Sequence, residues 1–361
     1  MLFVGRTRYR LPLEPAQARK WQALAEVFEL RVLGTGTGSG AHEFVLVPES
    51  GGLLGFYGLL PRRIARELRD FRAHAIVAQS PYEAAAALAG RRLARSRAKV
   101  LLEVHGDWGT ATRLYGSPRR RLLEPLSRRV ARAAVRRGDA VRTVSPFTTR
   151  LVREFGVEPA ATFTTYFDVS PFLETPPVSL PDGPRALFVG VIERYKNVAG
   201  LVEAWRIVQR RLPAATLHVV GRGREHAEIE RLVADCGGGV TWTESLPSAG
   251  VAAALDAAAL LVLPSFSEGL PRVAMEAFCR GRPVVGSRAG GIPDIVEDGV
   301  NGVLVPAGDA STLADALVRV LSDRELLERL AAGARESAAR WVQTPEQFAQ
   351  RFRDLVERML A

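Results

Sequence analysis

Short apolar runs alternate with longer amphipathic segments throughout the second half of the chain. The apolar runs have strand length, and we expect strands at 186–191, 216–221, 240–243 and 257–263. The amphipathic segments predict helices at 197–211, 225–235 and 309–321. Strands that alternate with helices in this way form doubly wound parallel sheets. Because the first half alternates similarly, the sequence predicts an α/β protein with two Rossmann-like domains facing a cleft.

A proline-rich segment divides the two halves. Pro176, Pro177, Pro181 and Pro184 all lie within 173–184, and such a segment is typical of an interdomain linker. We therefore expect an N-terminal domain over 1–172 and a C-terminal domain over 185–340. The remaining 341–361 is expected to be helical, since Thr344 begins a capping box with proline at the first helical position.

The composition limits the classes of protein to consider. Two cysteines, Cys236 and Cys279, provide neither a disulfide framework nor a metal-ligand cluster, so we expect a reducing, cytoplasmic setting and no metal. The first residues lack the pattern of a signal peptide. No apolar run approaches the roughly 20 residues that a membrane-spanning helix needs.

Positive charge is concentrated in one region. Residues 61–150 hold 21 Lys and Arg against 7 Asp and Glu, a net +14, while the whole chain carries +10. Attraction to an anionic membrane and an arginine-rich solvated surface explain this excess equally well. A nucleic-acid partner is not expected, because no basic module with interleaved aromatic residues is present. Within this region we expect a basic helix over 117–137 whose core-facing stripe consists of Leu122, Leu123, Leu126, Val130 and Ala133.

The segment 264–281 follows an expected strand and reads as a loop and then a helix. Pro271 suits the first helical position, Leu270 before it is a poor N-cap, and Gly281 ends the helix. An uncapped helix start binds anions, because its backbone N–H groups and the helix dipole both favour negative charge. The N–H groups expected to do so belong to Gly269, Leu270, Arg272 and Val273.

Two carboxylates frame this expected anion site. Glu268 lies in the loop, and Glu276 lies eight residues later in the helix. A carboxylate can accept hydrogen bonds from two neighbouring hydroxyl groups of a sugar or a ribose. The segment therefore predicts a diphosphate-binding site between two sites for sugar rings, which is what a nucleotide-sugar requires.

The spacing Glu-x7-Glu within Ser-x-x-Glu-Gly-Leu-Pro resembles the donor-site signature of glycosyltransferase family 4, retaining enzymes of the GT-B fold. The resemblance implies transfer of a sugar from a nucleoside diphosphate sugar, with a UDP- or GDP-sugar favoured, and without a metal or other cofactor. It assigns Glu276 to the ribose and Glu268 to the transferred sugar. It also implies that the helix in 341–361 crosses back onto the first domain.

The resemblance extends to other donor contacts. Lys196 stands at the lysine of the family's Gly-Arg-x5-Lys phosphate loop, but Val191 replaces the arginine, and we expect Arg194 to substitute for it. Leu246 lies where the family holds the nucleobase through its backbone, and Arg222 either lines the nucleotide pocket or is exposed. The predicted donor-binding set is Gly5, Arg194, Lys196, Arg222, Leu246, Glu268, Gly269, Leu270, Pro271, Val273 and Glu276, and Lys196 and Glu268 are also expected to act in catalysis.

His105 follows the expected strand 100–104, at the edge of the sheet where ligands bind. It resembles the family's histidine that contacts the transferred sugar, and it is our third catalytic candidate. Asp107 and Trp108 either shape the acceptor cleft or pack internally. Gly5 ends the expected first strand, 2–5, and a basic loop over 6–12 follows it. The glycine run over 34–40 is expected to be a flexible turn and not a dinucleotide fingerprint, because a strand-like segment follows it.

The acceptor is expected to be a glycan, a glycolipid or a lipid-linked precursor, with a peripheral position on the inner membrane face as one option. Two other functions remain open. A nucleotide-sugar epimerase has the same two-domain fold, and a non-catalytic protein could bind the nucleotide-sugar without turnover.

Overall fold

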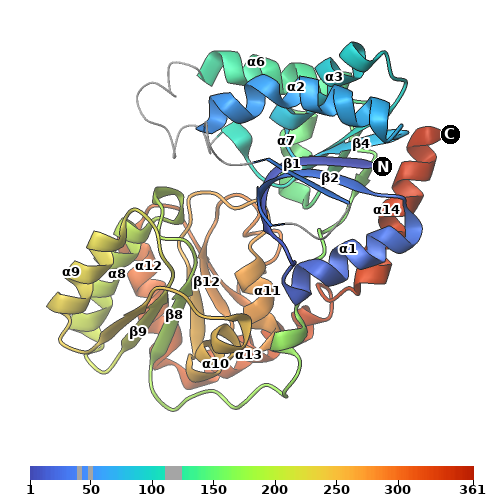
Figure 1. Ribbon diagram of the computed structural model, residues 1–361. Helices are drawn as coiled ribbons and strands as arrows, with labels where there is room; N and C mark the ends of the chain where they lie inside the picture. The colour runs from blue at the N-terminus through green and yellow to red at the C-terminus, as the bar shows by residue number, and fades with distance from the viewer. Residues whose placement is uncertain (39–42, 48–51, 110–123) are drawn as a thin grey trace. The chain divides into compact units, whose positions relative to one another are not determined.

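The computed structural model describes residues 1–38, 43–47, 52–109 and 124–361. The chain forms two compact units, which are described separately. The first comprises Met1–Phe167 together with Gln343–Ala361, and the second comprises Asp168–Val342. Each unit is a parallel sheet covered by helices (Figure 1), which confirms the predicted fold of two Rossmann-like domains.

The first unit contains a seven-stranded sheet in the order β3-β2-β1-β4-β5-β6-β7. Its strands are β1 (Leu2–Arg10), β2 (Arg31–Thr37), β3 (Phe44–Val47), β4 (Ala75–Ala78), β5 (Lys99–Val104), β6 (Ala140–Thr143) and β7 (Ala161–Thr162). Its helices are α1 (Pro15–Val27), α2 (Gly52–Asp70), α3 (Pro81–Ala94), α6 (Glu124–Arg137), α7 (Pro146–Arg153) and α14 (Pro345–Leu360). All neighbouring strands pair in parallel.

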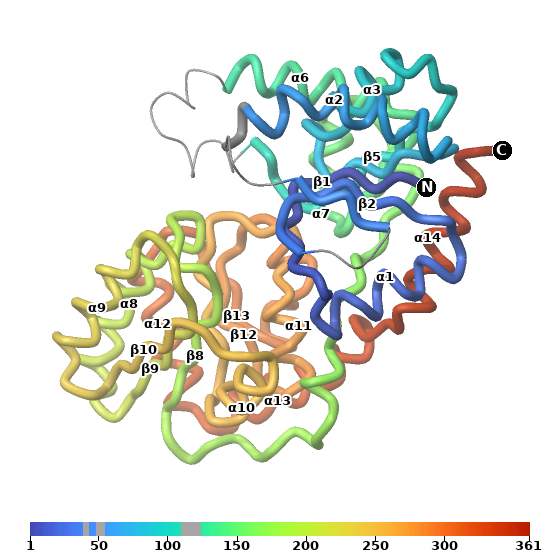
Figure 2. Tube along the Cα trace, viewed as in Figure 1, coloured from blue at the N-terminus to red at the C-terminus, as the bar shows by residue number. Residues whose placement is uncertain are grey.

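An apolar core lies between each face of this sheet and the helices that cover it. Helices α2 and α3 pack over Leu2, Val4 and their neighbours on one face. On the other face, Trp21 of α1 and Phe352 of α14 pack against Phe3 of β1. Helix α14, at the C-terminal end of the chain, lies beside α1 (Figure 2), and its capping box at Thr344 forms as predicted. The end of the chain therefore returns to the first unit.

The second unit contains a six-stranded parallel sheet in the order β10-β9-β8-β11-β12-β13. Its strands are β8 (Arg185–Val189), β9 (Thr216–Val220), β10 (Val240–Thr243), β11 (Leu260–Leu263), β12 (Val284–Ser287) and β13 (Gly302–Val305). Its helices are α8 (Val198–Arg211), α9 (His226–Asp235), α10 (Ser248–Ala257), α11 (Arg272–Cys279), α12 (Ala310–Ser322) and α13 (Arg324–Ala338), with 3-10 turns η1 (Ser170–Phe172) and η2 (Arg194–Lys196). Its core is built around the fully buried Trp205.

Two predictions near the N-terminus are wrong. The expected basic loop over 6–12 is largely strand, because β1 continues to Arg10 after a shift in register between Val4 and Arg8. The expected glycine turn is also strand as far as Thr37, and 39–40 lie outside the described residues. Gly36 allows this because a Cβ atom there would lie 1.8 Å from the Tyr9 carbonyl oxygen. Small residues thus let the second strand pass close to the first.

The predicted apolar stripe of the basic helix is wrong for Leu126 and Val130, while Ala133 is half-buried. Leu126 and Val130 on α6 are 60% and 37% exposed, whereas Ala131, Ala134 and Val135 are buried. Small side chains allow α6 to approach α3, and this contact places the larger aliphatic residues outside. Leu122 and Leu123 lie outside the described residues.

Two smaller differences concern helix α10. Ser248 is its first residue and not its cap, since Pro247 holds the cap position. The helix continues to Ala257, and β11 therefore begins at Leu260, later than predicted.

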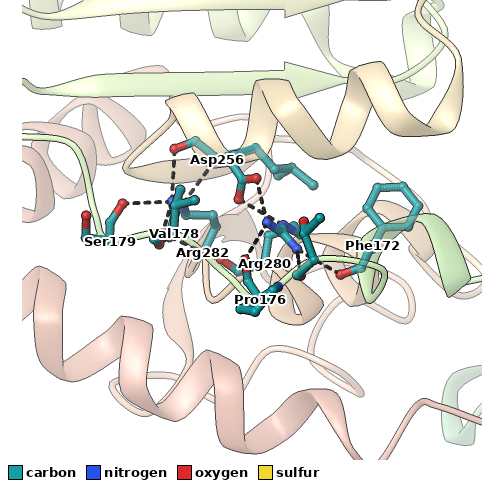
Figure 3. A network of polar contacts seen from close by, with 9 residues as sticks. Phe172, Pro176, Val178, Ser179, Asp256, Arg280 and Arg282 are labelled. Carbon is teal, nitrogen blue, oxygen red and sulfur yellow. Dashed lines mark hydrogen bonds and ion pairs between the residues drawn. The ribbon is translucent and has the colours of Figure 1, made fainter.

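The expected linker over 173–184 lies within the second unit, held by two buried arginines (Figure 3). Arg280 donates to the carbonyl oxygens of Phe172, Thr175 and Pro176. Arg282 donates to those of Val178 and Ser179. Asp256 pairs with Arg280 at 2.6 Å, so the charge of this guanidinium is compensated. The segment is thus bound to its unit by a fixed set of hydrogen bonds.

Candidate functional site

The loop between β11 and α11 fixes the position of the Glu268 carboxylate. Ser265, fully buried, donates its hydroxyl hydrogen to Glu268 Oε1 at 2.8 Å. The Glu268 carbonyl oxygen accepts a hydrogen bond of 2.7 Å from the backbone N–H of Gly291. Gly290 has φ +56°, and a Cβ atom there would lie 2.4 Å from the same carbonyl oxygen. The two glycines therefore allow one loop to support the other.

Lys196 is the direct partner of Glu268. Its Nζ lies 2.5 Å from Glu268 Oε1, and the two side chains are only 10% and 11% exposed. The backbone N–H of Phe266 donates to the Tyr195 carbonyl oxygen at 2.7 Å, which ties the two loops together beside this pair. An ammonium group has three donors, so Lys196 can also contact an anionic ligand.

Helix α11 begins beside this pair. The sequence suggested that Pro271 is the first residue of this helix, but in the structure Pro271 is its N-cap. It forms no side-chain cap hydrogen bond. The positive end of the helix dipole is therefore not neutralised by a capping side chain. Leu270 is half-buried and Val273 is buried at this end of the helix.

Glu276 lies in the second turn of α11, and its side chain is 14% exposed. Burial raises the pKa of its carboxyl group, although the Arg272 guanidinium 4.0 Å away acts in the opposite direction. A carboxylate kept away from water is unfavourable unless it is well paired, and the pairing of Glu276 with the exposed Arg272 is long. The Glu276 carboxylate would gain from hydroxyl donors supplied by a ligand.

Other predicted donor residues lie in loops at the carboxyl ends of neighbouring strands. The loops after β8 and β9 are joined by a hydrogen bond from Ile192 N–H to the Arg222 carbonyl oxygen, at 3.0 Å. Arg194 and Arg222 are both exposed. Leu246 is half-buried just before α10. Among the predicted donor residues, the side chains of Lys196 and Glu268 contact each other directly.

In the first unit, His105 follows β5 and lies between two polar side chains. Its Nε2 is 3.6 Å from Glu103 Oε2, and its Nδ1 is 3.4 Å from Thr165 Oγ1. Glu103 is buried and pairs with the fully buried Arg142. Gly5 also belongs to this unit, where it lies inside β1 against the Gln79 side chain.

The sequence reasoning missed Ser265, Glu103 and Arg142. Ser265 is the serine of the Ser-x-x-Glu-Gly-Leu-Pro signature, but its hydrogen bond to Glu268 is seen only in the folded chain. Glu103 and Arg142 interrupt apolar strands, Val-Leu-Leu-Glu-Val and Val-Arg-Thr-Val. Charged residues at strand positions of this kind are rarely buried unless they are paired, and this signal could have identified them.

Two family models match the chain. The model described as Glycosyl transferases group 1 matches residues 183–323, and the one described as Glycosyltransferase Family 4 matches residues 22–165. The chain belongs to glycosyltransferase family 4. The two matches lie in different units, so membership does not depend on the donor loop alone.

Two named glycosyltransferases are similar to part of the chain. An alpha-D-kanosaminyltransferase of Streptomyces kanamyceticus is 33% identical over 43% of this chain and 41% of its own length. A D-inositol 3-phosphate glycosyltransferase of Paenarthrobacter aurescens is 33% identical over 50% of this chain and 46% of its own length. The chain thus matches less than half the length of these two relatives.

Solved structures share the fold over nearly the whole chain. Sucrose-phosphate synthase from Thermosynechococcus elongatus has a TM-score of 0.78 and 21% identity, covering 99% of this chain and 98% of its own. HepE from Anabaena, solved with UDP and glucose, has a TM-score of 0.72 and 19% identity over the same shares. Among the described residues, no helix is long and apolar enough to span a bilayer, and no cluster of His, Cys, Asp and Glu could hold a metal ion.

Proposed function

We propose that this chain is a metal-independent, retaining glycosyltransferase that moves a hexose-type sugar from a nucleoside diphosphate sugar to a hydroxyl acceptor. The observation that carries the proposal is the pairing of Lys196 with Glu268 beside the start of α11. A cation and a helix N-terminus together favour a diphosphate. The family membership of the chain supports the same reading.

The donor contacts follow from the chemistry of each group. Lys196 and the first turn of α11 bind the diphosphate, with Arg194 as an additional cation from the same loop as Lys196. Glu268 accepts hydrogen bonds from hydroxyl groups of the transferred sugar, and Glu276 accepts them from the ribose. The backbone at Leu246 holds the base, and we favour a UDP- or GDP-sugar.

In the proposed reaction, the bond between the anomeric carbon and the leaving phosphate oxygen breaks, and a bond to the acceptor oxygen forms on the same face. The acceptor's proton passes to the leaving diphosphate. Negative charge develops on that diphosphate, and Lys196 with the helix N-terminus stabilises it more in the transition state than in the ground state. His105 contacts the transferred sugar.

Calorimetric titration with UDP, GDP, ADP and a panel of their sugars tests donor binding. The full chain is expected to bind one nucleotide class, and Lys196→Ala is expected to weaken that binding about 10–100-fold, the loss typical of removing a charge-assisted contact. Lys99→Ala, which removes an exposed lysine of the first unit, is the matched control and should bind as the parent does. Binding that is equally tight in Lys196→Ala would contradict the proposed phosphate seat.

The anomeric configuration of the product, followed by proton NMR during turnover, tests retention. An inverted product would refute the same-face route. An epimer formed from donor without acceptor would favour an epimerase, and donor binding without turnover on any acceptor would favour a non-catalytic binding protein.

We also propose that the acceptor is lipid-linked and that α6 contacts an anionic membrane. Leu126 and Val130 are exposed among five arginines on this helix, Arg128, Arg129, Arg132, Arg136 and Arg137. Exposed aliphatic side chains within a basic surface suit the boundary of an anionic bilayer. This would also account for the +14 charge of residues 61–150.

Cosedimentation with phosphatidylglycerol vesicles tests this contact. Binding should weaken in the double substitution Leu126→Ser/Val130→Ser and should fall steeply with salt. Leu173→Ser, which changes an exposed leucine of the second unit, is the control. Equal binding by parent and variant would exclude α6, and binding to DNA but not to vesicles would favour a nucleic-acid partner.

A further inference from the structure

A buried ion pair lies directly beside His105. Glu103 on β5 and Arg142 on β6 are register partners in neighbouring strands. Arg142 is fully buried, and Glu103 is 4% exposed. Burial alone would raise the pKa of the Glu103 carboxyl group, but the charge of Arg142, followed by smaller effects of the neighbouring His105 and Lys20 side chains, outweighs it and lowers this pKa to about 2. Glu103 is therefore a carboxylate at any pH where the protein works, with hydrogen-bond acceptors and no donor.

Both polar neighbours of the imidazole are held by Arg142. Its Nη1 donates to Glu103 Oε1, and its Nη2 lies 3.4 Å from Thr165 Oγ1. The same Nη2 donates to the Phe163 carbonyl oxygen at 2.9 Å, which fixes the segment that carries Thr165. One guanidinium thus sets the positions of the groups next to Nε2 and Nδ1 of His105.

The terminal helix covers this guanidinium. The Arg142 guanidinium carbon lies 4.1 Å from the ring centre of Phe163, and 5.4 and 5.7 Å from those of Phe348 and Phe352 on α14. A guanidinium is attracted to aromatic faces, and burial strengthens this attraction. The three rings enclose the guanidinium and restrict Arg142 to one position. Because Arg142 is paired with Glu103, they restrict Glu103 as well.

We infer that Glu103 is a positioning residue that holds the His105 imidazole in one orientation and one tautomer. The inference rests on the proposed function, in which His105 contacts the transferred sugar. The carboxylate retains the proton on Nε2, since Glu103 can only accept. In the neutral ring, Nδ1 then keeps its single lone pair, which can accept from the Thr165 hydroxyl or, in its place, from a hydroxyl group of the sugar. The 3.6 Å separation from Nε2 exceeds a hydrogen bond, and we expect it to shorten when donor binds.

The variant that tests this must remain folded. Removing either partner alone would leave an uncompensated buried charge, so both are replaced together in Glu103→Met/Arg142→Met, since apolar replacement of a buried pair is often tolerated. The matched control is Glu67→Met/Arg31→Met, which removes another ion pair of the first unit, at 3.3 Å. Circular dichroism and thermal melting establish that both variants are folded.

The first measurement is nitrogen-15 NMR of the imidazole, which reports the tautomer without requiring turnover. The parent and the control should show the Nε2–H form almost exclusively, whereas the Glu103/Arg142 variant should show a clearly larger fraction of the Nδ1–H form, as an unconstrained neutral imidazole does. An unchanged tautomer in the folded variant would overturn the inference. This outcome is independent of the proposed function, which fails instead if the parent binds no nucleotide.

The second measurement is turnover. The Glu103/Arg142 variant should lose about 100-fold in kcat, the scale of a misplaced catalytic contact, while donor KM changes little. Adding His105→Ala should then have much less effect than it has in the parent, because Glu103 acts through His105. Full kcat in the folded variant, or an undiminished effect of His105→Ala, would each contradict the positioning role.

Discussion

Each unit contains an acid–base pair near its proposed ligand-binding edge, and the two pairs differ in how they are held. Glu103 and Arg142 lie on adjacent strands, and aromatic rings enclose the guanidinium. Lys196 and Glu268 come from two loops, and both side chains retain about a tenth of their surface in solvent. The first pair is built into a sheet, whereas the second joins two loops.

The difference in enclosure indicates that the two ion pairs have different roles. Neither partner of a fully enclosed pair can leave the other without a large free-energy penalty, so such a pair suits a fixed support for a neighbouring group. A pair between loops can be rearranged by a ligand that provides better partners, so it suits a binding site. Removal of single side chains and a change of pH can therefore test this distinction.

Removal of the enclosed cation should be the most damaging change. Arg142→Ala leaves Glu103 buried without its counter-charge and is expected to lower the free energy of unfolding by about 3–5 kcal/mol. Urea denaturation measures this loss. Arg206→Ala removes the cation of the solvent-exposed pair with Asp235 and should lower it by about 1 kcal/mol or less. Equal losses would show that enclosure does not distinguish the pairs.

Acid should weaken the enclosed pair within a defined range. The pKa of Glu103 is about 2 in the folded chain, below the usual 4.5. The pair therefore stabilises the fold fully above pH 4.5, and this contribution, roughly 3 kcal/mol, is lost as the pH falls toward 2. Chemical denaturation at several pH values measures it. A folded Glu103→Met/Arg142→Met variant should lack this part of the acid dependence, and an identical dependence would refute the assignment.

The hydrogen bond that orients the loop carboxylate should matter less. Ser265→Ala removes the donor to Glu268 Oε1 and should reduce kcat/KM about 5-fold, equivalent to about 1 kcal/mol. Ser322→Ala, at the exposed end of α12, is the control. If Ser265→Ala retains full activity, Lys196 alone is sufficient to hold Glu268.

The smallest expected effect has opposite signs for stability and binding. Burial raises the pKa of Glu276 above its usual value, so its ionised form destabilises the fold once the pH rises through that folded pKa. Glu276→Gln should therefore raise Tm slightly at pH 8, while weakening donor binding through a poorer acceptor. Thermal melts with and without donor measure both effects, and a lower Tm without donor would contradict this account.

The sequence was sufficient to predict the alternation of elements and the donor loop. Apolar runs of strand length and the signature around Glu268 are local patterns, and they identified the sheets and the candidate donor residues. It was not sufficient for contacts that depend on which segments become neighbours. Gly36 is strand because Tyr9 of β1 lies against it, and Leu126 is exposed because alanines of α6 face α3.

The same limit applies to the candidate site in the first unit. His105 could be proposed as a site residue from its place after a strand. Its position, however, depends on Glu103 and Arg142, and Arg142 packs against a helix about 200 residues farther along the chain. Periodicity within one segment cannot reveal such a combination. The one sign of this combination in the sequence is a charged residue within each of two apolar strands, Glu103 and Arg142.

The hydrogen bonds of Arg280 and Arg282 have a practical consequence for dividing the chain. A fragment cut at the end of the proline-rich segment, near residue 185, would lose the carbonyl groups from Phe172 to Ser179. Two guanidinium groups would then be left in an apolar interior with too few acceptors, and aggregation during expression would be the natural outcome. A fragment beginning at Asp168 would retain all of these acceptors and is the better choice for isolating the second unit.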